Sequence, residues 1–206
     1  MKLYIVRHGE SRMNAMDLHQ SEDVELSEHG LKQAEAVARR FLNIPIDIII
    51  SSSFTRARQT AEIINKNLNK PVEYSRLFSE MKNPSAIVGK PRTGPEAKSI
   101  MELRWANVHN PDWKHSDEEN FYEFRSRALK GMRHLIEINK DNVLLITHGI
   151  FIDMILSIMA YGPEVGPNDY RTFLKFLHMD NTGLTLCKYE EDKWSMLSWN
   201  DRAHLG

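Results

Sequence analysis

The sequence predicts an α/β fold, specifically a three-layer α/β/α sandwich with a mostly parallel central sheet. Short apolar runs rich in β-branched residues alternate with longer segments in which apolar residues recur at helical spacing. Three of the runs are followed closely by Arg or His. Groups placed at the carboxyl ends of strands commonly bind ligands in an open α/β sheet.

Length and charge narrow the class of protein. A chain of 206 residues can bury one substantial core, so we expect a single domain over residues 1–206. The net charge of -1 gives no general attraction to nucleic acid or to an anionic membrane. No apolar stretch approaches the roughly 20 residues that cross a bilayer, and no signal-peptide pattern is present. We therefore expect a cytoplasmic protein with no nucleic-acid or membrane partner.

The cysteine and histidine residues of the sequence form no recognisable metal-binding motif. The single cysteine, Cys187, excludes an internal disulfide and a multi-Cys metal site, and its apolar surroundings predict a buried thiol. Nine histidines are present, but no His-Glu-x-x-His motif or close pair at helical spacing occurs. We expect neither a metal nor another cofactor.

The first of the three strand ends lies near the start of the chain. Residues 3–6 form an apolar run that predicts a buried strand, and Arg7, His8 and Gly9 follow it, with Asn14 a short distance on. A lone His at a strand end is more often structural than catalytic. The motif gains weight only from the two stretches that follow.

Those two stretches place similar groups in similar positions. The predicted strand 46–50 precedes a Ser-rich turn and a helix over 55–68, whose N-terminal turn can hold an anion beside Arg56. The predicted strand 143–146 ends at Thr147, His148 and Gly149. Packing alone does not explain three such strand ends in one chain.

The rest of the chain completes the alternation. Ser27 is predicted to cap a helix that buries Leu31, Ala34, Ala38 and Phe41 on one face. Further along we expect a strand over 71–74, helices over 100–108, 121–136 and 150–160, a loop over 162–168, and an edge hairpin of 184–189 with 194–199.

Residues 81–118 contain several Pro and Gly and predict a cap-like insertion over the strand ends. The segment is too rich in loops to hold a core of its own. Together with residues 162–170, it is expected to decide which substrate binds, because loops on a rigid scaffold carry specificity.

The three strand-end motifs together resemble those of the histidine phosphatase superfamily, also called the phosphoglycerate mutase-like family. The matching segments, which run from residue 3 to residue 205, include Arg7-His8-Gly9-Glu10-Ser11, Arg56-Ala57 with Gln59-Thr60-Ala61, and Thr147-His148-Gly149. Asn14 falls on the family's phosphate-contacting Asn, whereas Asp153 stands where Arg is frequent. We expect that last difference to affect packing more than chemistry.

The resemblance implies a phosphatase that hydrolyses a phosphate monoester through a phosphohistidine on His8. Arg7, Arg56 and His148 would stabilise the negative charge of the transferring group, because forked Arg donors match phosphate oxygens in pairs. Asn14 and Gly149 complete the expected phosphate-binding set. With arginine supplying the positive charge, the reaction needs no divalent metal.

The leaving alcohol needs a proton, and Glu80 is the expected donor. The family places an acidic residue after a Leu in this region, which Leu77-Phe78-Ser79-Glu80 matches, but the residues after Glu80 depart from the family's glycine-rich continuation. Glu118 and Glu119 are therefore alternative acids.

Two other functions stay open. A cofactor-dependent phosphoglycerate mutase is disfavoured, since family members with that activity carry Glu-Arg-His-Tyr-Gly at the acid position and paired arginines in the insertion, and neither occurs here. A catalytically silent module that binds a phosphorylated ligand is the other alternative. The expected substrate is a phosphorylated small molecule or a phosphoprotein, and the edge hairpin could pair two copies into a homodimer.

Overall fold

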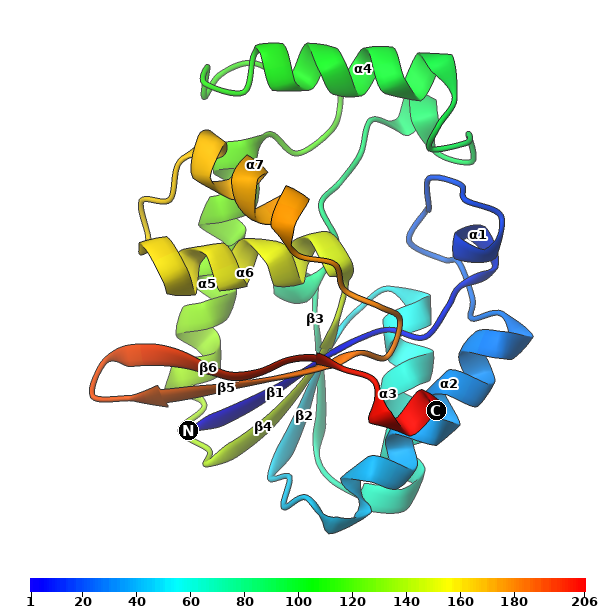
Figure 1. Ribbon diagram of the computed structural model, residues 1–206, viewed down its shortest axis with the longest axis vertical. Helices are drawn as coiled ribbons and strands as arrows, with labels where there is room; N and C mark the ends of the chain where they lie inside the picture. Colours follow the sequence, from blue (N-terminus) through cyan, green and yellow to red (C-terminus); the bar gives the residue numbers. More distant parts are fainter.

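Six strands form one mixed sheet in the computed structural model, which describes residues 1–206, in the order β3-β2-β4-β1-β5-β6 (Figure 1). The strands are β1 (Lys2–Arg7), β2 (Ile48–Ser52), β3 (Val72–Ser75), β4 (Asn142–Thr147), β5 (Leu184–Glu190) and β6 (Lys193–Asp201). β1 to β4 run parallel, whereas β5 is antiparallel to β1 and β6 to β5. The predicted mostly parallel sheet with an edge hairpin is confirmed.

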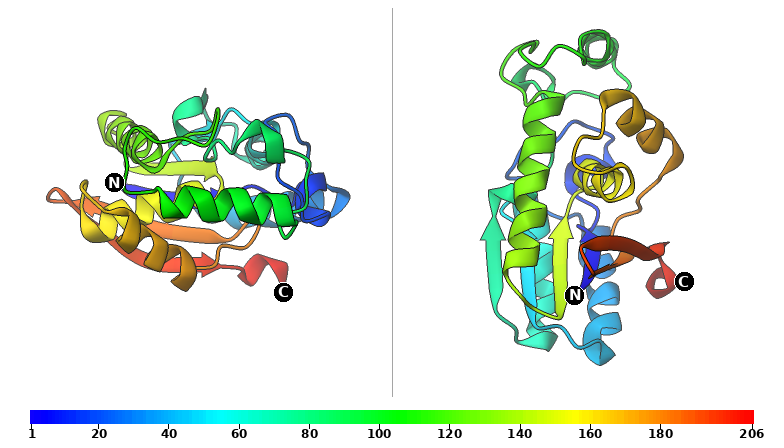
Figure 2. Two further views of the ribbon diagram at one scale, coloured as in Figure 1. Left: turned by 90° about the horizontal axis from the view of Figure 1, so that it is seen from above. Right: turned by 90° about the vertical axis from the view of Figure 1, so that its left-hand side faces the viewer.

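Helices cover both faces of this sheet (Figure 2). They are α1 (Arg12–Ala15), α2 (Glu28–Arg40), α3 (Thr55–Leu68), α4 (Pro95–Ala106), α5 (Phe121–Glu137), α6 (Gly149–Tyr161) and α7 (Pro167–Phe176), with short 3-10 turns η1 (Phe41–Asn43), η2 (Arg76–Phe78), η3 (Ser85–Ile87) and η4 (Ala203–Leu205). None of the helices combines the length and the apolar character that a membrane span needs.

Alternation along β1 shows how the three layers form. Leu3 and Ile5 are fully buried in a cluster with α5 and α6, whereas Tyr4 and Val6 are buried in a second cluster with α2 and α3. Successive side chains of a strand point to opposite faces, so a continuous apolar run requires helices on both sides. The predicted α/β/α sandwich follows.

The segment 81–118 lies beyond the carboxyl ends of the parallel strands. Figure 1 shows α4 at the top of the molecule, apart from the sheet. Three apolar side chains of this segment, Ile87, Ala97 and Ile100, form a small buried cluster of their own. That cluster is more core than the sequence pattern led us to expect, although three residues are too few to stabilise a domain.

Two expectations about helices are wrong. Leu31 is 40% exposed, because the inner face of α2 is made by Gly30, Ala34, Val37 and Ala38 instead. The expected loop over 162–168 ends early, since α7 begins at Pro167. Proline is favoured at the first position of a helix, because an N–H group there would have no intrahelical partner.

Cys187 is fully buried in the core, as its apolar run predicted. Burial raises the pKa of its thiol to about 12. The thiol therefore stays protonated and packs as a small apolar side chain.

Candidate active site

The central strands β2, β4 and β1 are neighbours, so their carboxyl ends meet at one edge of the sheet. Arg7 ends β1 opposite Thr147, which ends β4, and α3 begins just after β2. This arrangement brings together three residues that are far apart in the sequence, His8, Arg56 and His148. All three are at least 98% buried.

Two hydrogen bonds define the tautomer of His8. Its Nδ1 lies 2.7 Å from the carbonyl oxygen of Gly9, which can only accept, so Nδ1 carries the proton. Nε2 is then unprotonated and accepts from Nε of Arg56 at 3.2 Å. Burial, with the charges of Arg56 and Arg7, holds the pKa of His8 well below its usual value. His8 is thus a neutral imidazole whose Nε2 is unprotonated.

The two arginines are held by backbone carbonyls and still have donors to spare. Arg56 donates from Nη1 to Ser21 O at 2.9 Å, and its guanidinium lies over the Phe54 ring. Burial lowers the pKa of Arg56 to about 10, so it stays charged at neutral pH. Arg7 donates from Nη1 to Met179 O, while its buried Nε has no protein partner.

His148 lies beside His8, with the ring centroids 5.1 Å apart. Its Nε2 is 2.8 Å from Oγ of Ser52, and Ser52 Oγ is 3.3 Å from Oγ of Ser79. The other ring nitrogen, Nδ1, is buried without a protein partner. Burial and the nearby Arg56 charge lower the pKa of His148.

The turn after His8 needs glycine at two facing positions. A Cβ on Gly9 would lie 2.5 Å from the carbonyl oxygen of Gly30, and a Cβ on Gly30 would lie 1.9 Å from that of Glu10. Backbone can approach backbone this closely only without side chains. The start of α2 therefore fixes the turn that carries His8.

The opposite side of that turn is fixed by residues 181 and 182, which the sequence patterns did not single out. The Asn181 side chain donates to His8 O at 2.8 Å, and Thr182 N donates to Arg7 O at 2.9 Å. Thr182 is buried with φ of 59°, a left-handed conformation that is unusual for a β-branched residue. Only the three-dimensional structure reveals this loop's role.

Glu80 lies at the N-terminus of α6. Its carboxylate oxygens accept the N–H groups of Ile150 at 3.2 Å and Phe151 at 3.0 Å, and Oε1 also accepts from Met81 N at 3.1 Å. These donors and the cations of Arg56 and Arg7 favour the anion, but burial outweighs them and raises the pKa of Glu80. A raised pKa suits a carboxyl group that gives a proton to a leaving group.

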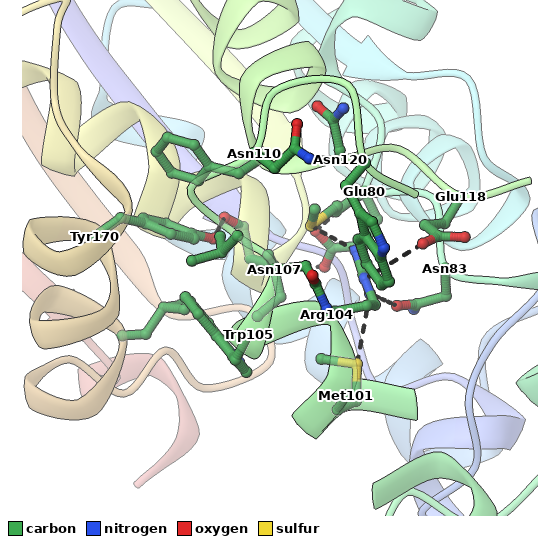
Figure 3. A pocket seen from close by; sticks show the side chains of 16 residues that line it. Glu80, Asn83, Met101, Arg104, Trp105, Asn107, Asn110, Glu118, Asn120 and Tyr170 are labelled. Carbon is green, nitrogen blue, oxygen red and sulfur yellow. Dashed lines mark hydrogen bonds and ion pairs between the residues drawn. The ribbon is translucent and has the colours of Figure 1, made fainter. Parts of the chain in front are cut away.

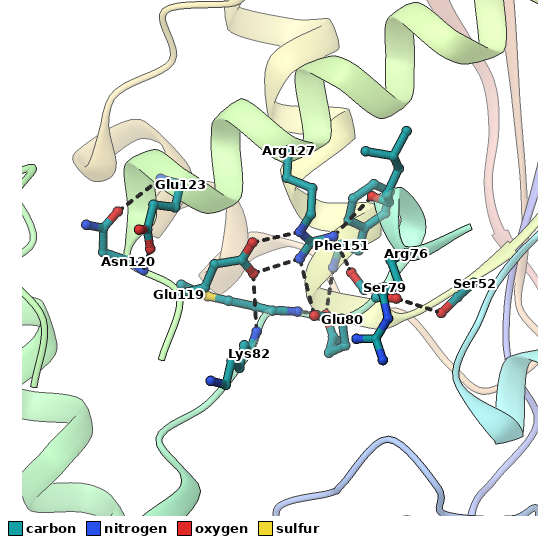
Figure 4. A network of polar contacts seen from close by, with 12 residues as sticks. Ser52, Arg76, Ser79, Glu80, Lys82, Glu119, Asn120, Glu123, Arg127 and Phe151 are labelled. Carbon is teal, nitrogen blue, oxygen red and sulfur yellow. Dashed lines mark hydrogen bonds and ion pairs between the residues drawn. The ribbon is translucent and has the colours of Figure 1, made fainter. Parts of the chain in front are cut away.

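Arg127 on α5 holds the segment that carries Glu80 (Figure 4). Its Nη1 donates to the carbonyls of Leu77 at 3.0 Å and Ser79 at 2.8 Å, and its Nη2 donates to Glu80 O at 3.3 Å. Two further bonds of 2.7 Å join the guanidinium to the carboxylate of Glu119. Sequence reasoning assigned Arg127 no role, since its partners are 8 to 50 residues away.

Neither alternative acid is placed like Glu80. Both carboxylate oxygens of Glu119 are occupied by Arg127. Burial alone would raise the pKa of Glu118, but the N–H groups of His115 and Ser116, which it accepts at 2.7 and 2.8 Å, lower it below its usual value. Glu80, by contrast, has Arg7 and Arg56 close by, and its pKa is raised.

Asn14 and Gly149 stand at the margins of the cluster. Asn14 Oδ1 accepts Ser11 N at 3.4 Å within the capping box of α1, and its side chain bonds none of the clustered groups. Gly149 begins α6, where a Cβ would lie 3.6 Å from Nε of Arg7. Arg92, in the segment 81–118, is close enough that its charge adds to the effect of burial and lowers the pKa of His8.

Asp153 is a buried carboxylate beside the site. The residue is 7% exposed, and its Oδ1 has no hydrogen-bond partner. Burial and the neighbouring charge of Glu80 raise the pKa of Asp153 to about 7, against an opposing effect of Arg7. Its position therefore bears on the charge of the site as well as on packing.

No group of three or more His, Cys, Asp or Glu side chains is arranged to hold a metal ion. The positive charges of the site come from arginine. One buried and one partly buried arginine, with two neutral histidines, at the strand ends of an α/β sandwich can bind a phosphoryl group through charge-assisted hydrogen bonds. The fold and the site thus define a phosphate-handling protein.

The sequence model of the histidine phosphatase superfamily, branch 1, matches residues 3–202, and the chain belongs to this superfamily. A protein of Hydrogenobacter thermophilus provisionally named phosphoserine phosphatase 2 is 30% identical over 207 residues, which cover 98% of this chain and 97% of that protein. Other relatives, 27% identical over 215 residues, are named as the phosphoglycerate mutase GpmB of Yersinia species. Family membership and the phosphatase names among the relatives identify the chain as a phosphatase.

Solved structures share the whole fold. Bacillus stearothermophilus YhfR has a TM-score of 0.84 at 20% identity, with 100% of this chain and 99% of that chain covered. Entamoeba histolytica phosphoserine phosphatase, solved with phosphoserine and with 3-phosphoglyceric acid, has a TM-score of 0.80 at 22% identity, with 99% and 98% covered.

Proposed function

We propose that this protein hydrolyses a phosphate monoester through a phosphohistidine on His8, without a metal ion. The observation that carries the proposal is the fixed tautomer of His8, whose Nδ1 is bound to Gly9 O and whose Nε2 is left unprotonated. A neutral, oriented imidazole can attack phosphorus and divide a difficult hydrolysis into two easier steps.

In the first step, Nε2 of His8 bonds to phosphorus as the ester oxygen departs. Arg7, Arg56 and Nδ1 of His148 are the groups proposed to bind the phosphoryl oxygens, since each has donor capacity that no protein atom uses. For Nδ1 of His148 to donate, Nε2 must accept from the Ser52 hydroxyl, which its 2.8 Å separation allows. Donors already in place when charge develops stabilise the transition state most.

Glu80 is proposed to give its proton to the departing alcohol oxygen. In the second step the resulting carboxylate takes a proton from water, the water oxygen bonds to phosphorus, and the bond from phosphorus to His8 Nε2 breaks. Inorganic phosphate leaves and Glu80 regains its proton, so the cycle closes. Arg127 supports this role by fixing the backbone on either side of Ser79.

The substrate is proposed to be a phosphorylated small molecule, and residues 81–118 are proposed to act as its cap. Proteins of this fold solved with phosphoserine and with 3-phosphoglyceric acid support a phosphorylated small molecule over a phosphoprotein, without fixing its alcohol part. The arginines provide the positive charge that a divalent metal supplies in other phosphoryl-transfer enzymes.

Release of inorganic phosphate from a panel of phosphorylated metabolites, with EDTA present, tests the proposal. Wild type should turn over at least one member, and His8→Ala should lose at least about 10⁴-fold in rate, because the nucleophile is gone. EDTA-sensitive turnover would overturn metal independence. Substantial turnover by a folded His8→Ala protein would remove His8 from the proposed role.

A further inference from the structure

A cavity of about 130 Å³ opens from Glu80 and extends beneath the cap (Figure 3). Glu80 and Ile150 form part of its wall, and α4, α7 and the start of α5 contribute other parts. His8, Arg7 and Arg56 do not line it. An acid that protonates a leaving oxygen must touch the leaving group, so this cavity lies where the alcohol part of a substrate has to go.

The walls of the cavity are mostly apolar, and they come from segments far apart in the sequence. Met101, Trp105 and Val108 line it from α4 and the residues just after α4, Trp113 and Phe121 from the next segment, and Leu174 from α7. The Arg171 guanidinium lies over the Trp105 ring, 4.9 Å from its centroid. Aromatic walls with flexible methionines favour an apolar group.

The one cation in the lining is already neutralised. Arg104 donates to Asn83 Oδ1 at 3.3 Å and to Glu119 O at 3.1 Å, and its Nε lies 4.0 Å from the buried carboxylate of Glu118. Burial lowers the pKa of Arg104. A second anionic group on a substrate would therefore meet no unpaired cation among the residues that line the cavity.

The polar amides of the lining are likewise engaged with the protein. Asn107 donates to Leu103 O at 2.9 Å, Asn110 accepts from Asp112 N at 3.1 Å, and Asn120 donates to Pro111 O at 2.7 Å. Asn83 accepts from Arg104. The amide atoms left over are neutral, so a charged substrate group would exchange its hydration for weaker partners, which is costly.

We propose that the preferred substrates are phosphate monoesters of neutral, apolar alcohols about the size of one ring. This inference rests on the proposed function, because it takes Glu80 as the proton donor to the leaving group. A dry cavity of about 150 Å³ in another protein is known to hold benzene, so the volume suits one ring. Alcohols that carry a carboxylate or an ammonium group fit the lining poorly.

The test compares 2-phenylethyl phosphate with 3-phosphoglycerate, two esters whose alkoxide leaving groups both need a proton. Wild type should favour 2-phenylethyl phosphate by at least about 10-fold in kcat/KM, the discrimination that small apolar differences produce in such pockets. Trp105→Ala should reduce that preference about 10-fold, mainly through KM. Leu103→Ala, on the exposed face of the same helix, is the matched control and should change neither substrate.

A second variant makes the cavity smaller, whereas Trp105→Ala makes it larger. Val108→Trp fills the cavity and should slow 2-phenylethyl phosphate while sparing ethyl phosphate. Binding of 2-phenylethyl phosphate to His8→Ala, measured by calorimetry, should weaken by a similar factor when Trp105→Ala is added. This readout needs no turnover.

The results distinguish a failure of the apolar substrate class from a failure of the proposed phosphatase function. Faster hydrolysis of 3-phosphoglycerate, unchanged by Trp105→Ala, would overturn the apolar substrate class and leave the phosphatase proposal standing. No phosphate release from either ester or from p-nitrophenyl phosphate would contradict the proposed function itself.

Discussion

The two ends of the proposed site are built in different ways. The phosphate end consists of side chains at or next to the carboxyl ends of three adjacent parallel strands, with His8, Arg56 and His148 fully or almost fully buried. The leaving-group end consists of Glu80 on an irregular segment and a cavity covered by the cap. The comparison indicates that the sheet positions the proposed nucleophile and phosphate-binding groups, whereas an irregular segment positions Glu80 and the cavity beside it.

The largest effect is expected at the phosphate end. Arg56→Lys removes the forked donor that touches His8 and should lower kcat/KM by about 10² to 10³-fold on every phosphate ester, aryl or alkyl. Arg58→Lys, two residues on and exposed, serves as the control and should be nearly silent. A loss confined to alkyl phosphates would contradict the division into two ends.

A change at the acid should separate the ends by leaving group. Glu80→Gln should slow alkyl phosphates about 10²-fold but affect the phosphorylation step with p-nitrophenyl phosphate much less, since p-nitrophenolate leaves without a proton. Because the pKa of Glu80 is raised, wild-type activity on alkyl phosphates should fall as pH rises through that pKa. Glu80→Gln should lose this basic limb. Equal losses of the phosphorylation rate on both kinds of ester would point to another donor.

A smaller effect is expected from the residue that positions the acid. Arg127→Lys keeps a positive charge but loses the two bonds to Glu119 and part of the grip on three carbonyls. We expect about a 10-fold drop in kcat on alkyl phosphates and a weaker effect on the phosphorylation rate with p-nitrophenyl phosphate. Arg133→Lys, exposed on the same helix, is the control. An unchanged pH profile and unchanged selectivity would limit Arg127 to a structural role.

The buried carboxyl of Asp153, beside the site, should make the free energy of unfolding depend on pH. Its pKa is raised from 3.8 to about 7, so its contribution to stability is complete below pH 3.8 and is lost as pH rises through about 7, a cost of about 4 kcal/mol. Asp153→Asn removes that cost, although an unpaired buried amide returns about 1–3 kcal/mol of it.

Urea unfolding at two pH values measures the difference. At pH 8 we expect Asp153→Asn to be more stable than wild type by about 2 kcal/mol, with no such gain at pH 4. An equal change at both pH values would mean that the charge of Asp153 has no part in it.

The same contrast governs what could be predicted from the sequence. His8, Arg56 and His148 follow apolar runs, so a local pattern and the rules of parallel sheets suffice to bring them together. Arg127, Asn181 and Thr182 act through backbone groups many residues away, and no local pattern reports such contacts. The prediction for Leu31 was wrong because the buried face of α2 includes the neighbouring position, Gly30, instead. The start of α7 was missed because Pro167 was interpreted as part of a loop.

The most direct test of the account is to trap the phosphorylated enzyme. Glu80→Gln is mixed with p-nitrophenyl phosphate and quenched in alkaline detergent, and the phosphorylated residue is located by mass spectrometry. Phosphorylation should stay fast while hydrolysis slows, because water loses its base, so phosphate should accumulate on His8 in nearly stoichiometric amount. Steady turnover with no phosphate on His8, or with phosphate on another residue, would contradict the account.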